Sequence, residues 1–146
     1  MDRGMSENLG IAVHELGHAI MGKAWSKPGS EIVIAPTEDG WETLVAWDER
    51  RFDDRSACVA SMAGILAEFA FRNDTLKDVR ELALRNALRT PIGEHDTLHT
   101  NLPGAVQAEL VDWVYPVIRH YLNSAVGFSA VSEITEAMDH GKAFTI

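Results

Sequence analysis

The segment His14-Glu15-Leu16-Gly17-His18 constrains this chain more than any other feature. Residues four apart lie on one face of an α-helix, so the imidazoles of His14 and His18 can point at the same metal ion if the segment is helical. Gly17 would let another element approach that helix closely. The pattern predicts a zinc-binding helix in which Glu15 takes a proton from a metal-bound water. The alternative interpretation is an ordinary helix with two surface histidines.

Composition limits the class of protein. The chain has 146 residues, of which 46% are hydrophobic, and this predicts a single domain over residues 1–146. Its formal net charge of −9 argues against a nucleic-acid or anionic-membrane partner, because both need a basic surface. A polypeptide partner fits this charge better.

The apolar stretches predict a cytoplasmic, soluble protein. The first eight residues are polar and do not resemble a secretory signal. The longest apolar stretch, residues 58–71, is too short to span a bilayer and contains Glu68. Cys58, the single cysteine, lies in this stretch, so we expect a buried structural thiol.

Hydrophobic periodicity predicts a mainly α (α+β) fold. The expected helices cover residues 7–25, 53–72, 76–88, 94–100, 105–123 and 129–140. Residues 31–35 and 41–47 have β-type composition, and the turn-rich residues 36–40 between them predict a hairpin. The hairpin is therefore inserted after the helix that carries the two histidines.

The hairpin has two expected consequences. Its exposed edge could hold an extended peptide backbone by strand addition, largely without regard to side chains. Trp41 and Trp47 are six residues apart and share one face of a regular strand, so we expect that face to be buried or at an interface. We interpret these two residues, with Trp25 and Trp113, as packing or hairpin-flanking residues rather than as ligand-stacking ones.

Two histidines supply only part of a catalytic zinc site, which usually has three protein ligands. Candidates for the third ligand are Asp96, Glu68, His95 and His99. Asp96 could instead cap a helix, and Glu68 could instead hydrogen-bond to a zinc-bound histidine. Spacing alone leaves these candidates nearly even.

Four short blocks, in order, resemble the peptidase domain of the FtsH family of ATP-dependent zinc proteases, the M41 peptidases. The blocks are residues 12–19 (AVHELGHA, similar to the family's AxHEAGHA), 32–36 (IVIAP, similar to VTIxP), 63–68 (AGILAE, similar to GGRxAE) and 93–96 (GEHD, similar to GASND). The resemblance covers roughly residues 7–100, and only its first block is specific by itself.

The resemblance implies a zincin-like helical domain and assigns roles to individual residues. It makes His14, His18 and Asp96 the ligands of a Zn²⁺ cofactor and Glu15 the general base. Glu68 becomes a neighbour of the site rather than a ligand. The implied activity is that of a zinc metalloendopeptidase that hydrolyses flexible or unfolded polypeptide.

The chain also departs from the family pattern. Ala63 replaces the first glycine of the third block, and Ile65 replaces its arginine. The segment before the fourth block is longer than in the family, and Pro103-Gly104 interrupts the expected helix after Asp96. Because the motif lies so early in the chain, we expect no ATPase module or transmembrane helix ahead of it. ATP-driven degradation would then need a separate ATPase partner, and oligomerisation stays open.

Two other functions stay open. One is a non-catalytic zinc-binding or regulatory module that keeps the helix without turnover. The other is an ImmA/IrrE-like peptidase, which the first block alone also resembles. Such an enzyme would cut one dedicated regulator and would use a glutamate, here Glu68, as its third ligand.

Overall fold

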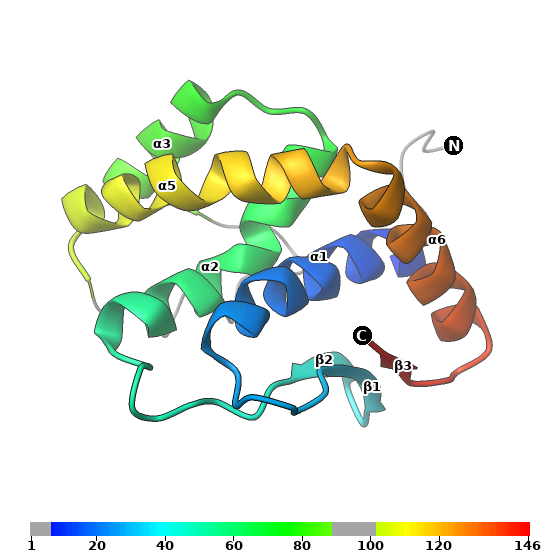
Figure 1. Cartoon of the computed structure of the whole chain (residues 1–146). Helices are drawn as coiled ribbons and strands as arrows, with labels where there is room; N and C mark the ends of the chain where they lie inside the picture. The colour runs from blue at the N-terminus through cyan, green and yellow to red at the C-terminus, as the bar shows by residue number, and fades with distance from the viewer. Residues whose placement is uncertain (1–6, 89–101) are drawn as a thin grey trace.

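The computed structural model describes residues 7–88 and 102–146, which form a group of packed helices with a small sheet at one side (Figure 1). Its elements are α1 (Glu7–Gly22), the 3₁₀ turn η1 (Lys23–Trp25), β1 (Val33–Thr37), β2 (Gly40–Leu44), α2 (Asp54–Phe71), α3 (Leu76–Leu84), α5 (Gly104–Leu122), α6 (Ala125–Asp139) and β3 (Phe144–Thr145). The mainly α (α+β) fold class is confirmed, and the hairpin does follow the first helix.

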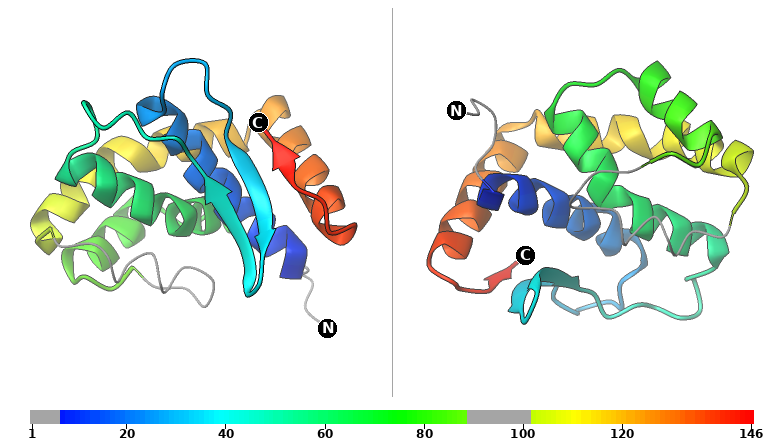
Figure 2. Two further views of the ribbon diagram at one scale, coloured as in Figure 1. Left: turned by 90° about the horizontal axis from the view of Figure 1, so that it is seen from below. Right: turned by 180° about the vertical axis from the view of Figure 1, so that it is seen from behind.

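The core forms where α2 lies between α1 and α5 (Figures 1 and 2). Gly17 of α1 sits directly on α2: a Cβ atom there would meet the Ala63 carbonyl oxygen and would lie 2.6 Å from Ala67 Cβ. The predicted close approach at Gly17 is therefore confirmed. Ala63 and Ala67 are fully buried at this contact, so the two helices pack with almost no side chain between them.

The sheet lies beside α1 and has the strand order β2-β1-β3, with both pairs antiparallel (Figure 2). The Ile146 N–H donates to the Ile32 carbonyl at 2.8 Å, so residues 32, 34 and 36 turn their backbone groups toward β3. The backbone nitrogen of Pro36 faces this side rather than β2, so its missing N–H costs no hydrogen bond to β2. Trp41 and Thr43 lie opposite Pro36 and Ile34, so their backbone groups point to the outer edge of β2.

Side-chain caps explain where several helices begin. Asp53 accepts from the Ser56 N–H at 2.9 Å and Thr75 accepts from the Asp78 N–H at 3.1 Å, so α2 and α3 begin where the sequence predicts. Ser124 accepts from the Gly127 N–H at 3.1 Å and starts α6 four residues before the predicted position 129. The prediction missed this cap.

Other predicted boundaries were also wrong. The hairpin turn is shorter than expected because β1 continues to Thr37 and β2 starts at Gly40, whose φ of 151° is available to glycine. The second strand ends at Leu44 rather than at residue 47. Helix α3 stops at Leu84 rather than at residue 88, because Asn86, two residues later, takes a left-handed φ of 52°. Strand β3 was not predicted. The expected helix over residues 94–100 lies outside the described residues.

None of the described helices is long and apolar enough to cross a membrane. Cys58 is buried, as predicted, with 3% of its surface exposed.

Replacing Gly17 with alanine tests the helix contact. The added methyl group would overlap α2, so we expect Gly17→Ala to lower the free energy of unfolding by about 1–2 kcal/mol, even though alanine favours helix. Lys23→Ala, an exposed change just after α1, should alter it by less than about 0.5 kcal/mol. Urea denaturation of both variants measures the difference, and equal stability would contradict this packing.

Candidate metal centre

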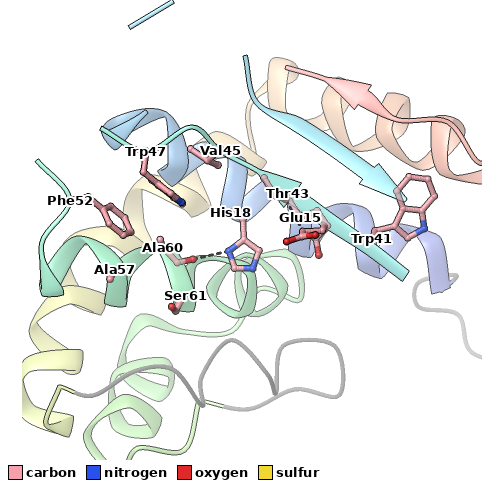
Figure 3. Close-up of a pocket in the computed structure, with 11 residues that line it drawn as sticks. Glu15, His18, Trp41, Thr43, Val45, Trp47, Phe52, Ala57, Ala60 and Ser61 are labelled. Carbon is pink, nitrogen blue, oxygen red and sulfur yellow. Dashed lines mark hydrogen bonds between the residues drawn. The ribbon is translucent and has the colours of Figure 1, made fainter. Parts of the chain in front are cut away.

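Helix α1 brings the two predicted histidines together. The Nε2 atoms of His14 and His18 lie 3.1 Å apart, and their rings meet edge to face. His14 is buried with 2% of its surface exposed, while His18 also borders a cavity (Figure 3). The spacing of four residues therefore places both imidazoles on one face of α1, as predicted.

Each imidazole is held in place through its other nitrogen. His18 Nδ1 lies 2.7 Å from the Ala60 carbonyl oxygen, which can only accept, so Nδ1 carries the proton (Figure 3). His14 Nδ1 lies 2.7 Å from Glu68 Oε2, and an ionised carboxylate likewise requires the proton on Nδ1. A neutral ring that carries its proton on Nδ1 presents an Nε2 lone pair, and each Nε2 here faces the other ring.

This arrangement favours a cation between the two rings. Two acceptors 3.1 Å apart repel each other unless a proton or metal ion lies between them. Two imidazoles bound to zinc at about 2.0–2.1 Å with tetrahedral angles have nitrogens about 3.3 Å apart. The donor atoms present therefore suit zinc in type and in spacing.

Gly64 of α2 leaves the space that such an ion needs. A Cβ atom at this position would lie 2.6 Å from His14 Nε2 and 2.6 Å from His18 Nε2. Any residue other than glycine would place its side chain against both lone pairs. The glycine retained in the third family-like block thus lies beside the two imidazoles.

The described residues supply two of the predicted ligands, His14 and His18. Within residues 7–88 and 102–146, no group of three or more His, Cys, Asp or Glu side chains is placed to hold a metal ion. Asp96, the third predicted ligand, and the alternatives His95 and His99 lie outside the described residues. Glu68 binds the Nδ1 side of His14, on the opposite edge of the ring from Nε2.

Glu15 projects toward the sheet, where Thr43 of β2 meets it (Figure 3). The Thr43 hydroxyl lies 2.7 Å from Glu15 Oε1 and 3.0 Å from the Glu15 carbonyl oxygen, and shares its single proton between these acceptors. With 7% of its surface exposed, Glu15 is nearly buried, yet it borders the same cavity as His18. The hydrogen bond fixes the direction of its carboxylate.

The cavity beside His18 and Glu15 has a volume of about 420 Å³ and lies between α2 and the outer edge of β2 (Figure 3). Trp41 and Trp47 both line it, so they share a face although the strand ends between them. Trp47 stacks on Phe52 with ring centroids 4.4 Å apart. Trp113 is 57% exposed, so its interpretation as a packing residue was wrong.

Sequence analysis missed Thr43, the Ala60 carbonyl and the pair of Trp47 with Phe52. Period-two alternation from Trp41 could have placed Thr43 on the same face of the strand. A backbone carbonyl has no signal in the sequence.

Tyr115 offers no additional functional group, because it is 1% exposed and its hydroxyl donates to the Asp74 carbonyl at 2.6 Å. Burial raises the pKa of this tyrosine to about 12.

Comparison with known proteins adds no relative. No family model matches the chain, and no curated protein matches its sequence. The resemblance to the FtsH family therefore stays a prediction that rests on four short blocks and on the chemistry of the residues in them.

Gly64→Ala tests whether a metal occupies the space between the imidazoles. We expect the purified variant to lose zinc on dialysis, because its methyl group would occupy the position that faces both Nε2 atoms. The variant should keep its helical content but be less stable than wild type, because the added methyl group would also press against the buried ring of His14. Ser61→Ala, one turn earlier on the same helix, is the control and should keep its zinc. Elemental analysis and circular dichroism measure both properties, and a zinc-loaded Gly64→Ala protein would contradict the site.

Proposed function

We propose that this chain is a zinc-dependent metallopeptidase that hydrolyses peptide bonds of flexible or unfolded polypeptide. The observation that supports this most is the fixed pair of imidazoles, whose Nε2 atoms are 3.1 Å apart while both Nδ1 atoms are engaged elsewhere. Structural histidines do not need this arrangement, whereas zinc ligands do.

The proposed ligands are His14, His18 and Asp96, the last from the family resemblance. Zinc held by two neutral imidazoles and one carboxylate would lower the pKa of a water molecule in the site and polarise a substrate carbonyl. Glu68 has a different proposed role. Its hydrogen bond to Nδ1 orients His14 and makes Nε2 of that imidazole a stronger electron-pair donor to a metal ion.

Glu15 is the proposed general base. Its carboxylate follows His14 directly in the chain and borders the cavity, so it can accept a proton from the attacking water and return it to the leaving amine. The hydrogen bond from the Thr43 hydroxyl fixes the orientation of this carboxylate. A base that is already oriented loses less freedom when the reaction begins.

The outer edge of β2 is the proposed site for the substrate backbone. The backbone groups of Trp41 and Thr43 point to this edge, and both residues line the cavity beside His18. An extended peptide added there would run past the imidazole pair. Only unfolded segments can add to an edge in this way, so folded substrates would need a separate ATPase that unfolds them.

The two alternatives make different use of the same residues. A regulatory module without turnover would bind zinc but would not need the bond between Thr43 and Glu15. An ImmA/IrrE-like peptidase would need Glu68 as third ligand, but Glu68 Oε2 lies 2.7 Å from Nδ1 of His14 and so faces away from Nε2. This position disfavours Glu68 as a ligand.

Metal content of purified variants tests the proposed ligand set. We expect about one zinc per chain in wild type and in Glu15→Gln, and much less in Asp96→Ala. Glu68→Ala should keep measurable zinc with an affinity reduced about 10–100-fold, as is typical when a residue that orients a metal ligand is lost. Peptide cleavage should disappear in Glu15→Gln alone among the variants that are fully loaded with zinc. Loss of zinc only in Glu68→Ala would instead support the ImmA/IrrE-like alternative.

Thr43→Val tests the orientation of the base. Valine matches threonine in shape but cannot donate to Glu15, so we expect kcat to fall about tenfold with KM and zinc content unchanged. Thr43→Ser keeps the hydroxyl and should retain most of the activity. Steady-state kinetics on a fluorogenic peptide measures these values. Equal kcat in Thr43→Val and wild type would remove Thr43 from the mechanism.

A further inference from the structure

Trp47 and Phe52 form an aromatic pair that does not serve the core. Their rings stack with centroids 4.4 Å apart and an interplanar angle of 27°. Both side chains are partly exposed, and the hydrophobic core of the described residues includes neither of them. Both line the cavity beside His18 (Figure 3). Aromatic side chains exposed in a cavity are typical of ligand sites.

Backbone hydrogen bonds of its two chain neighbours hold Trp47 in place. Trp47 forms an isolated antiparallel bridge with Ser26, flanked by hydrogen bonds from Lys27 N–H to Ala46 at 2.8 Å and from Asp48 N–H to Trp25 at 2.7 Å. Trp47 is therefore anchored to the segment that follows α1.

The turn between the two aromatic residues is also fixed. Burial opposes ionisation of Asp48, but hydrogen bonds from the Arg50 N–H and the Arg51 guanidinium outweigh it and hold the pKa of this carboxyl below its usual value. Phe52 directly precedes Asp53, the cap of α2. A surface that is ordered before binding loses little entropy when a ligand arrives.

Small side chains line the part of the cavity formed by α2. Ala57 and Ala60 of α2 face the aromatic pair, and their short side chains leave room for a large one. In Figure 3 the pair lies on one side of His18 and Glu15 lies on the other. A substrate side chain that packs against Trp47, Phe52 and Ala57 would therefore lie in the same cavity as His18.

We propose that Trp47 and Phe52 form a specificity subsite for an aromatic or large aliphatic side chain of the substrate, on a residue that flanks the scissile bond. The proposal rests on the proposed peptidase function and adds a side-chain preference to the backbone recognition at β2. An apolar side chain gains from leaving water and from contact with the aromatic pair. Glu15 and Glu42 border the same cavity, so their charge would disfavour an acidic side chain there.

Cleavage of a mixed peptide library tests this preference. We expect zinc-loaded wild type to cut next to Phe, Tyr, Trp, Leu or Met, as read by mass spectrometry of the products. For two peptides that differ only in Phe or Ser at the selected position, the ratio of kcat/KM values should fall about tenfold in Trp47→Ala and in Phe52→Ala. Trp47→Phe keeps an aromatic ring and should preserve most of the ratio. Trp113→Ala removes an exposed tryptophan of α5 and should leave the ratio unchanged.

Binding to zinc-loaded Glu15→Gln separates this proposal from the peptidase function. Peptides retained by this variant should be enriched in the same side chains, and the enrichment should disappear when Trp47→Ala is added. Enrichment without cleavage by wild type would support the subsite and contradict the peptidase function. Cleavage without a preference, or with a preference that survives both alanine variants, would overturn the subsite and leave the peptidase function standing. Absence of both cleavage and enrichment would overturn both proposals.

Discussion

The close contact between α1 and α2 is the constraint on which the candidate site depends. Gly17 allows the two helices to touch, and three positions four residues apart on α2 then meet the histidines of α1. The Ala60 carbonyl accepts from His18, Gly64 leaves space beside both Nε2 atoms, and Glu68 accepts from His14. One helix thus orients both imidazoles and keeps the space between them open.

The hairpin supplies the other side of the site. β3 pairs with the far edge of β1, so β2 is an edge strand. Thr43 of β2 lines the cavity and donates to Glu15. The carboxylate of Glu15 therefore lies where α1 meets the sheet, while the imidazoles lie where α1 meets α2. A single helix can serve both functions because adjacent residues, His14 and Glu15, point in different directions along its surface.

Local patterns predicted much of this arrangement. The spacing of His14 and His18, the glycine between them and the start of a helix near Asp53 are local signals, and the structure agrees with each. The contact of Glu68 with His14 was among the alternatives that the sequence offered. Other contacts between distant segments were not predictable, because nothing in one segment identifies its partner in another. The Ala60 carbonyl and Thr43 are of this kind. The pairing of Trp47 with Phe52 was not predicted, because the position of Trp47 depends on the bridge to Ser26 rather than on a regular strand.

The way the histidines are held links metal binding to stability. In a flexible site, two Nε2 acceptors could separate and each find water. Here His14 is 2% exposed and both rings are tied through Nδ1, so the fold itself keeps the acceptors 3.1 Å apart. A cation that binds between them removes this repulsion in the folded state alone. Free metal at a thousand times its dissociation constant would then stabilise the fold by about 4 kcal/mol. If the proposed ion binds there, the rigidity that prepares the site would make the stability of the fold depend on that ion.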